Sequence, residues 1–277
     1  MSRILVVDDD RTTRELLRIQ LGKGGYEVEE ADHGEEALRK VRESQYDLLL
    51  LDVWMPGMDG LEVLKRLHAA GPHPPVIVMT GDDTSETALR AVREQAYRFV
   101  SKPFAASALL ELIESAIESG HAARPIEVIS ARPDWVELLV PCDLESAERI
   151  QDFLARLDTD LPEEIRRRIG AAFRELLVNA IEWGGKLDPE RTVRISYLRA
   201  KRMLMYRIAD PGKGFSFEGL QHSAMSNPED QPFLHTEVRE QKGLRPGGLG
   251  LMMTKAMVDE LIYNEAHNEV VFIKYLD

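Results

Sequence analysis

Short apolar runs alternate with amphipathic segments along the first 120 residues of the chain. The runs are too short for helices and are typical of strands buried in a parallel sheet, whereas the segments between them repeat apolar residues at helical spacing. Five strands are predicted, near residues 4–7, 26–30, 48–51, 75–79 and 97–100. Five helices are predicted, near 11–21, 34–41, 58–69, 85–93 and 107–118, the first closed by Gly22. This alternation predicts a doubly wound α/β fold.

The rest of the chain mixes its elements differently, because pairs of strands lie between longer helices. Residues 119–125 break the helical pattern, and we expect one domain over 1–120, a linker and the start of the next domain over 121–133, and a second domain over 134–277. Strands are predicted near 126–130, 135–140, 193–198, 203–208, 262–263 and 269–275, and helices near 144–157, 162–183 and 252–261. Residues 216–245, rich in Gly, Pro, Ser, Asn and charge, have weak periodicity and suggest a mobile lid.

Composition and charge narrow the range of partners and compartments. The chain has 277 residues, 44% of them hydrophobic and 30% charged, as in a globular protein of two domains. Its net charge of −13 argues against a nucleic-acid partner, because phosphate contacts need clustered Lys and Arg. No apolar stretch approaches the roughly 20 residues of a membrane span, and the first residues run straight into a strand pattern, so neither a membrane partner nor a signal peptide is expected. The single cysteine, Cys142, excludes an intramolecular disulfide and fits a cytoplasmic location.

Reactive side chains follow directly after the predicted strands of the first domain. Asp8 and Asp9 follow the first strand, Asp52 the third, Thr80 the fourth and Lys102 the fifth. Loops after parallel strands open on the same edge of a sheet, so these groups are expected to converge. Clustered carboxylates resist joint ionisation unless a cation is present, and a hard ion such as Mg²⁺ suits their oxygens. With that ion bound, Asp52 is a candidate nucleophile toward a phosphoryl donor, and Lys102 and Thr80 are candidates to hold the phosphoryl oxygens.

Helix capping is the alternative interpretation of acidic residues at such positions. Capping accounts for Asp82 or Asp83 before the fourth predicted helix. It does not account for the joint placement of Asp8, Asp9, Asp52 and Lys102, so a phosphoryl-accepting site is the better interpretation of this edge.

Residues 1 to about 120 resemble the response-regulator receiver domain, a flavodoxin-like (βα)5 fold. The matching motifs are Val-Val-Asp8-Asp9, Leu-Asp52-Val-Trp-Met-Pro-Gly-Met-Asp-Gly60, Met-Thr80-Gly and Ser-Lys102-Pro-Phe, in the family's order and spacing. The resemblance implies that Asp52 accepts a phosphoryl group from an upstream sensor histidine kinase. It implies that Thr80 and Phe99 form a coupled switch pair and that the Lys102–Pro103 peptide bond is cis. The Mg²⁺ ligands that it implies are Asp8, Asp9, Asp52 and the backbone carbonyl of Trp54.

A second group of polar residues lies on one predicted helix of the second domain. Glu175, Asn179 and Glu182 are spaced by four and three residues, which places them on one face of an otherwise apolar helix. Taken alone, a solvated helix face is the favoured interpretation. Two glycine-rich motifs further along the chain change the balance, since such turns let backbone amides meet phosphate. The motifs are Asp210-Pro-Gly212-Lys-Gly214-Phe and Gly248-Leu-Gly250-Leu.

Residues from about 130 to 277 resemble the GHKL ATP-binding fold, an α+β (Bergerat) sandwich, and are closest to its serine-kinase branch typified by anti-sigma factor kinases. The resemblance implies that Asn179 coordinates Mg²⁺ between the phosphates of ATP and that Glu175 positions or deprotonates the attacking hydroxyl. It implies that Asp210 accepts the adenine amino hydrogen. The other nucleotide contacts that it implies come from Glu182, Gly212, Gly214, Gly248, Gly250 and, toward the γ-phosphate, Arg245.

Three functions remain open. The first is a protein kinase that is controlled by phosphorylation of Asp52 and acts on Ser or Thr of a partner such as an anti-sigma-factor antagonist. The second is a module that uses ATP as a structural cofactor and sequesters a sigma factor or another regulator. The third is a variant histidine kinase, although no segment resembles a phosphoacceptor-histidine helix. Glu175 and Asn179 favour the first, with a two-state switch that shifts homodimerisation or the ATP lid by about 1–3 kcal/mol.

Overall fold

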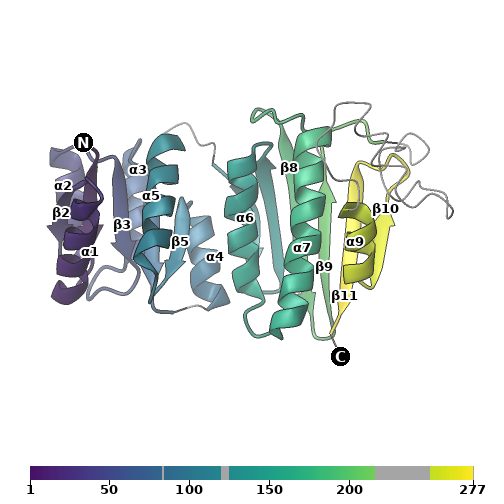
Figure 1. Cartoon of the computed structure of the whole chain (residues 1–277), viewed down its shortest axis with the longest axis horizontal. Coiled ribbons are helices and arrows are strands. Elements are labelled where there is room, and N and C mark those ends of the chain that lie inside the picture. The colour runs from purple at the N-terminus through teal and green to yellow at the C-terminus, as the bar shows by residue number, and fades with distance from the viewer. Residues whose placement is uncertain (83, 120–124, 216–249, 277) are drawn as a thin grey trace. The chain divides into compact units, whose positions relative to one another are not determined.

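The computed structural model describes residues 1–82, 84–119, 125–215 and 250–276, and Figure 1 shows the whole chain. The chain divides into two compact units, Met1–Ala123 and Arg124–Asp277, and each has its own sheet. The lid predicted over 216–245 lies outside the described residues. Within the described ranges, every helix is too short or too polar to cross a membrane.

A five-stranded parallel sheet in the order β2-β1-β3-β4-β5 forms the centre of the first unit. Its strands are β1 (Arg3–Val7), β2 (Glu27–Ala31), β3 (Leu48–Asp52), β4 (Val76–Thr80) and β5 (Arg98–Ser101). The helices are α1 (Arg11–Lys23), α2 (Gly34–Glu43), α3 (Gly60–Ala70), α4 (Ser85–Arg93) and α5 (Ala106–Ser119). This arrangement confirms the predicted doubly wound α/β fold.

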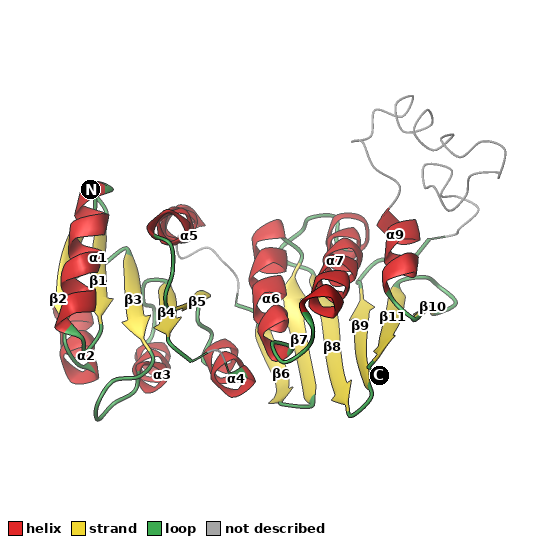
Figure 2. Ribbon diagram, turned by 60° about the horizontal axis from the view of Figure 1, so that its bottom comes forward, coloured by secondary structure: helices red, strands yellow, loops and turns green. Residues whose placement is uncertain are grey.

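The first sheet is buried on both faces because successive side chains of each strand point to opposite sides. Leu49 and Leu51 of β3 enter the apolar cluster beneath α2 and α3, whereas Leu48 and Leu50 enter the cluster beneath α1 and α5. Figure 2 shows these two groups of helices on opposite sides of the strands. Since all four leucines are fully buried, the register of β3 is fixed, and its last residue, Asp52, is held at the carboxyl edge of the sheet.

Helix α1 continues past Gly22, where the sequence pattern had placed its end. A Cβ atom at Gly22 would meet nothing within 4 Å, so no close contact requires glycine there. The helix is capped instead by Gly24, whose backbone N–H donates to the Gln20 carbonyl at 3.2 Å. The predicted end was wrong because one glycine destabilises a helix by only about 1 kcal/mol.

A six-stranded antiparallel sheet in the order β10-β11-β9-β8-β7-β6 forms the second unit. Its strands are β6 (Glu127–Arg132), β7 (Trp135–Pro141), β8 (Thr192–Ala200), β9 (Met203–Ala209), β10 (Glu260–Tyr263) and β11 (Glu269–Tyr275). Helices α6 (Leu144–Leu157), α7 (Glu163–Asn179) and α9 (Gly250–Met257) lie on one face of this sheet (Figure 2), and a π-helix, η2 (Ala180–Gly184), continues α7. This architecture confirms the predicted α+β fold.

Aromatic rings fasten α7 to the second sheet. The Tyr206 ring of β9 lies 5.3 Å from Phe173 of α7, 5.1 Å from Tyr197 of β8 and 4.9 Å from Phe272 of β11, measured between ring centroids. All four side chains are buried, so the rings join the helix to three adjacent strands. The helix that carries Glu175 and Asn179 therefore has a fixed place on the sheet.

A buried carboxylate ties the connection between α6 and α7 to the same strands. Asp158 is 3% exposed and accepts hydrogen bonds from the hydroxyls of Tyr197 at 2.7 Å and Tyr206 at 3.0 Å. Arg199 donates to Asp158 at 3.3 Å and to the two oxygens of Asp160 at 2.7 and 2.6 Å. Burial raises the pKa of Asp158, while the tyrosine hydrogen bonds act to lower it. The cluster anchors the chain where it enters α7.

One predicted helix end in the second unit was wrong. The helix expected to reach Trp183 does extend that far, but it becomes π-helical from Ala180, whose carbonyl accepts from the Gly185 N–H at 2.8 Å. The helix expected to reach Leu261 ends earlier, because Leu261 pairs with Phe272 of β11 instead. Apolar residues at short spacing suit both a helix and a strand, and pairing with the sheet decided between them.

Candidate functional site

The carboxyl edge of the first sheet brings together the acids and the lysine that the sequence indicated. Asp8 directly follows β1 and is 1% exposed, and Asp52 is the last residue of β3 and is 4% exposed. Asp9, the next residue after Asp8, is exposed. The Lys102 ammonium donates to Asp8 Oδ2 at 2.6 Å and to Asp52 Oδ1 at 2.6 Å. One carboxylate oxygen from each of the three acids lies within 4.8 Å of the others. The Lys102–Pro103 peptide bond is cis, as predicted.

Burial and charge act on this acid cluster in opposite directions. Burial raises the pKa of Asp52, and the hydrogen bond from Lys102 opposes that shift. Burial also disfavours the charged form of Lys102, but its hydrogen bonds to Asp52 and Asp8 outweigh burial and raise the Lys102 pKa. The two buried carboxylates therefore share a single ammonium, and Asp9 adds negative charge at the rim. Such a set of hard oxygens suits a further divalent cation.

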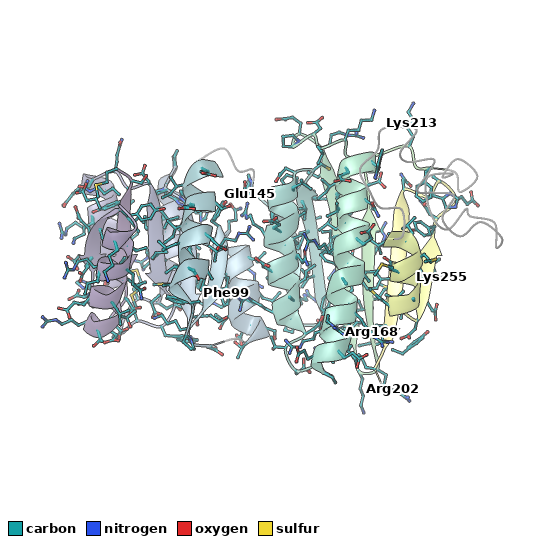
Figure 3. The ribbon with its side chains drawn as sticks, in the orientation of Figure 1. Phe99, Glu145, Arg168, Arg202, Lys213 and Lys255 are labelled. Atoms are coloured by element: carbon teal, nitrogen blue, oxygen red, sulfur yellow. The ribbon has the colours of Figure 1, made fainter. Side chains whose placement is uncertain are left out.

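The remaining residues predicted for the first site lie around the acid cluster. Thr80 is fully buried at the end of β4, and its hydroxyl accepts from the backbone N–H of Asp82 at 3.0 Å. Phe99 of β5, labelled in Figure 3, is half-buried and packs against the apolar cluster beneath α2 and α3. Trp54 lies two residues after Asp52, and its side chain is 52% exposed. The Thr80 hydroxyl is thus engaged with the loop that leads to α4.

Helix α4 is capped by a threonine. Thr84 is its N-cap, and the Thr84 hydroxyl accepts from the Thr87 N–H at 3.3 Å. Asp82 accepts from the Thr84 N–H at 3.2 Å and from the Thr84 hydroxyl at 3.0 Å. The expectation that Asp82 caps the helix was therefore wrong, because Asp82 holds the capping residue, and Asp83 lies outside the described residues.

Two residues shape the loops of the first site without having been singled out from the sequence. Arg14 of α1 donates to the backbone carbonyls of Asp8 at 2.7 Å and Asp9 at 3.1 Å. A Cβ atom at Gly60 would lie 2.0 Å from the Asp52 carbonyl oxygen, so only glycine lets α3 begin this close to β3. Gly60 is the last residue of the motif that follows Asp52. No sequence pattern distinguishes Arg14 from the exposed polar residues around it on the helix.

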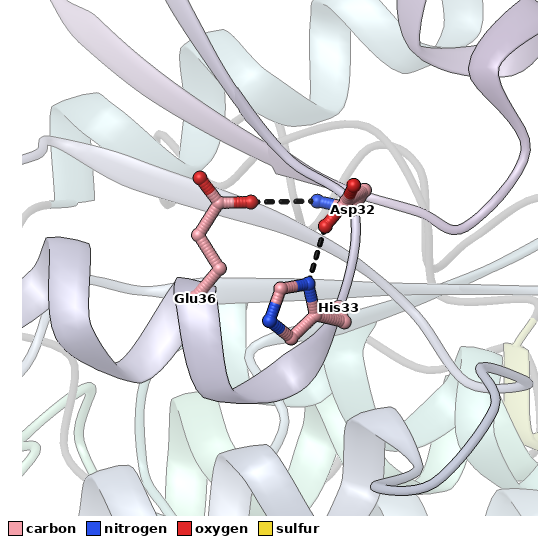
Figure 4. A group of neighbouring side chains, drawn as sticks. All are labelled: Asp32, His33 and Glu36. Carbon is pink, nitrogen blue, oxygen red and sulfur yellow. Dashed lines mark hydrogen bonds and ion pairs between the residues drawn. The ribbon is translucent and has the colours of Figure 1, made fainter.

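Another group of side chains with metal-ligand chemistry lies at the start of α2 (Figure 4). Asp32, His33 and Glu36 offer ligand atoms within 4.8 Å of one another. The His33 Nδ1 is hydrogen-bonded to the Asp32 carboxylate, and Glu36 accepts from the Asp32 N–H at 3.1 Å. These hydrogen bonds account for the grouping as the start of a helix, and we assign no metal to it.

Two of the three polar residues predicted on one helix face, Glu175 and Asn179, contact each other. Glu175 Oε1 accepts from Asn179 Nδ2 at 3.0 Å, as expected for residues one turn apart. A Cβ atom at Gly250, the first residue of α9, would lie 1.8 Å from Glu175 Oε1. Glycine therefore lets the second glycine-rich motif approach this pair without displacing the Glu175 carboxylate. Glu182 is half-buried in η2, where the π-helical turn departs from the α-helical phase of Glu175 and Asn179.

Asp210 follows β9 and lies against the end of η2. A Cβ atom at Gly184 would lie 2.1 Å from Asp210 Oδ1, and the same oxygen accepts from the Gly212 N–H at 2.7 Å. Burial raises the pKa of Asp210, whereas the Gly212 hydrogen bond and the charge of Arg191 act to lower it. The carboxylate thus occupies a space that Gly184 leaves open, and a backbone amide orients it.

The rest of the predicted nucleotide site is divided between the loop after Asp210 and residues that the structure does not describe. Gly214 has a φ of 79°, and a Cβ atom there would lie 1.6 Å from the Ala266 carbonyl oxygen, so conformation and space both require glycine. Lys213 is exposed and points away from the unit (Figure 3). Arg245 and Gly248 lie outside the described residues.

Both units match known domain families. The family of the response regulator receiver domain matches residues 4–114, and the family of the histidine kinase-like ATPase domain matches residues 140–274. The chain is therefore a response regulator receiver domain joined to a histidine kinase-like ATPase domain.

Two curated relatives support the assignment of the receiver domain. The response regulator MprA of Mycobacterium leprae is 43% identical over 113 residues, which are 41% of this chain and 50% of that protein. MprA of Mycobacterium ulcerans is 44% identical over 108 residues, 39% of this chain and 47% of that protein. The chain thus spans about half the length of the curated relatives it matches. A solved receiver domain protein (CheY-like) from Methanospirillum hungatei is 32% identical, with a TM-score of 0.42, over 43% of this chain and 95% of that chain.

Proposed function

We propose that this protein is an ATP-dependent protein kinase controlled by phosphorylation of Asp52, and that it phosphorylates Ser or Thr of a partner regulator of the anti-sigma-factor-antagonist kind. The proposal rests most directly on the Glu175–Asn179 pair beside Gly250. This pair joins a carboxylate that can accept a hydroxyl proton to an amide that can bind a phosphate-bound cation. A sensor histidine kinase acts upstream of the receiver.

In the receiver, Asp52 is the nucleophile toward the phosphoryl donor. Burial raises the pKa of Asp52, and the Lys102 ammonium at 2.6 Å opposes that shift and favours the ionised, nucleophilic form. The clustered oxygens of Asp8, Asp9 and Asp52 fit Mg²⁺, with the Trp54 carbonyl as a further ligand. When bound, that ion supplies neutralisation of the charge on the transferred group.

After transfer, Lys102 pairs with the phosphoryl oxygens on Asp52. The Thr80 hydroxyl gives up its contact with the Asp82 N–H and donates to the same oxygens, while the half-buried Phe99 ring turns inward. Since Thr80 is hydrogen-bonded to the loop before α4, this exchange changes the α4–β5–α5 face. The coupled output is the ATP site or homodimerisation.

In the ATPase domain, Glu175 orients or deprotonates the substrate hydroxyl, and Asn179 coordinates the Mg²⁺ that accompanies the phosphates of ATP. Asp210 accepts the adenine amino hydrogen. Within the part of the chain that the structure describes, Asp210 Oδ1 accepts a hydrogen bond and Oδ2 has no partner, so Oδ2 is left for the amino group. Phosphoryl transfer here depends mainly on positioning and charge neutralisation. The same site is completed by Glu182, Gly212, Gly214, Gly250 and, from outside the described residues, Arg245 and Gly248.

The test is transfer of label from γ-labelled ATP with Mg²⁺ to candidate partner proteins, with and without a phosphoryl mimic on the receiver. Label on a partner Ser or Thr that disappears in Glu175→Ala supports the kinase. Glu164→Ala is the matched control, because Glu164 is an exposed acid in the first turn of the same helix. Tight ATP binding without transfer identifies a sequestering module instead, and label on a histidine identifies a variant histidine kinase.

A further inference from the structure

We propose that Arg191 and Asn268 are positioning residues for the nucleotide base, because together they hold the loop that carries Asp210. This inference rests on the ATP site proposed above and adds two residues that lie outside its motifs. Neither residue is assigned a contact with ATP. Their role is to fix the backbone that aims the Asp210 carboxylate at the adenine amino group.

The order of the second sheet brings both side chains to this loop. Asp210 follows β9, which lies between β8 and β11. Arg191 directly precedes β8, and Asn268 directly precedes β11. Both neighbours are antiparallel to β9, so each begins beside the residues where β9 ends. The loop after β9 is therefore reached from both sides.

Each side chain holds one of two successive backbone carbonyls. Arg191 Nη2 donates to the Pro211 carbonyl at 2.6 Å, and Asn268 Nδ2 donates to the Gly212 carbonyl at 3.1 Å. The backbone carbonyl of Asn268 also accepts from the Asp210 N–H at 2.8 Å. Because peptide units are planar, fixing the Pro211 carbonyl also fixes the Gly212 N–H that binds Asp210 Oδ1.

The two positioning residues are themselves held in place. Arg191 Nη1 donates to the Gly185 carbonyl at 3.3 Å, so the same guanidinium joins the end of η2 to the Asp210 loop. Asn264 Nδ2 donates to Asn268 Oδ1 at 2.8 Å, which leaves the Asn268 amide hydrogens facing the Gly212 carbonyl. The side chains of Arg191 and Asn268 are therefore both oriented before any nucleotide binds.

The contacts of Arg191 and Asn268 are expected to influence recognition of the adenine amino group more than recognition of the rest of the nucleotide. A carboxylate placed to accept an amino hydrogen favours adenine over a purine that lacks this group, and one such hydrogen bond corresponds to roughly tenfold in affinity. A loosened loop lets Asp210 turn away, so the advantage of the amino group decreases while contacts with the phosphates remain. Discrimination between two bases therefore reports positioning, whereas overall affinity does not.

The experiment compares dissociation constants of the full chain for ATP and for purine riboside triphosphate, which lacks only the 6-amino group. Asn268→Asp keeps the oxygen that accepts from Asn264 but places an acceptor opposite the Gly212 carbonyl. We expect the wild type to prefer ATP by about tenfold, and Asn268→Asp to lose most of that preference with less than about twofold change for the analogue. Arg191→Gln is expected to reduce the preference in the same direction. Glu265→Gln, an exposed residue of the same turn, is the control and should leave both constants unchanged.

The outcomes separate this inference from the proposed function. An equal loss of affinity for both nucleotides in Asn268→Asp and Arg191→Gln assigns the pair a purely structural role and overturns the inference. A wild type that binds both nucleotides equally well also overturns it and leaves the kinase proposal standing. A wild type that binds neither nucleotide overturns the proposed function and the inference together. If Asn268→Asp does not fold, the preference measured in Arg191→Gln decides.

Discussion

The acid cluster of the receiver domain and the acidic residues of the ATPase domain hold their carboxylates in different ways. In the receiver, one ammonium, that of Lys102, donates to two buried acids from separate strands. In the ATPase domain, Glu175 accepts a hydrogen bond from a side-chain amide and Asp210 accepts one from a backbone N–H. Both carboxylates lie in space that neighbouring glycines leave open. The carboxylates of the first site are held by an opposite charge, whereas those of the second site are held in spaces that only small neighbouring residues leave open. A change of charge should therefore damage the first site most, and a change of volume the second.

The largest effect is expected from Asp52→Asn. This change removes the only proposed nucleophile of the receiver while keeping its size, so uptake of label from a small phosphodonor should fall below detection. Asp47→Asn is the control, because Asp47 is exposed directly before the same strand. Phosphorylation is measured by radiolabel or intact mass, and full labelling of Asp52→Asn would remove Asp52 as the acceptor.

The next largest effect is expected from Gly250→Ala. The added Cβ atom would lie 1.8 Å from Glu175 Oε1, so Glu175 or the start of α9 has to move, and ATP affinity should fall about tenfold to 100-fold. The fall is expected although Ala is the better helix former.

Gly170→Ala provides the matched control for volume. A Cβ atom at Gly170, inside α7, would meet nothing within 4 Å. This variant should keep its ATP affinity and gain about 0.5–1 kcal/mol in the free energy of unfolding. Calorimetric titration measures the affinities, and an unchanged affinity in Gly250→Ala would contradict a site limited by space.

A smaller effect is expected from Tyr206→Phe, which tests a charge-balanced carboxylate within the ATPase domain. The change removes the hydroxyl that donates to buried Asp158 at 3.0 Å. The free energy of unfolding of this domain should fall by about 1–3 kcal/mol, measured by denaturant titration. Tyr275→Phe removes an exposed hydroxyl bonded to Glu260 and should change it by less than about 0.5 kcal/mol. Equal losses in both variants would contradict the assigned importance of the buried hydrogen bond.

The smallest effect is a dependence of stability on pH. Burial raises the pKa of Asp158, so the folded state holds this proton more tightly than the unfolded state. The contribution of Asp158 to stability is therefore present at low pH and is lost as the pH rises from the ordinary value of 3.8 through the raised folded pKa. The free energy of unfolding is measured across this range for the wild type and for Asp158→Asn. The wild type should lose stability relative to Asp158→Asn as the pH rises. A difference that is constant with pH would contradict the raised pKa.

The receiver site could be predicted from sequence because it follows from chain order alone. Once four-residue apolar runs are assigned to a parallel sheet, the residues after them have to meet at one edge, which brings Asp8, Asp52 and Lys102 together. The Glu175–Asn179 contact follows in the same way from spacing on a helix. Both predictions use only local periodicity and one rule of topology.

Other parts of the molecule could not be predicted, because they depend on contacts between distant segments. The Gly184–Asp210 contact joins a π-helical turn to the end of a strand, and the motif that marks Asp210 does not indicate that Gly184 lies against it. Leu261 belongs to a strand only because β11 lies beside it. An arginine or asparagine outside a motif, such as Arg191 or Asn268, looks like any solvated residue until the sheet order is known.

The π-helical turn η2 can be regarded as a one-residue insertion at the end of α7. The Gly185 N–H reaches the Ala180 carbonyl, five residues back, so the chain leaves the helix one residue later than an α-helix would. Gly184 and Gly185 then occupy different confined places, the first against Asp210 and the second against Cys142. A homologue shortened by one residue here could retain only one of these two contacts. Segment length at this point, and not residue type alone, is therefore expected to be under selection.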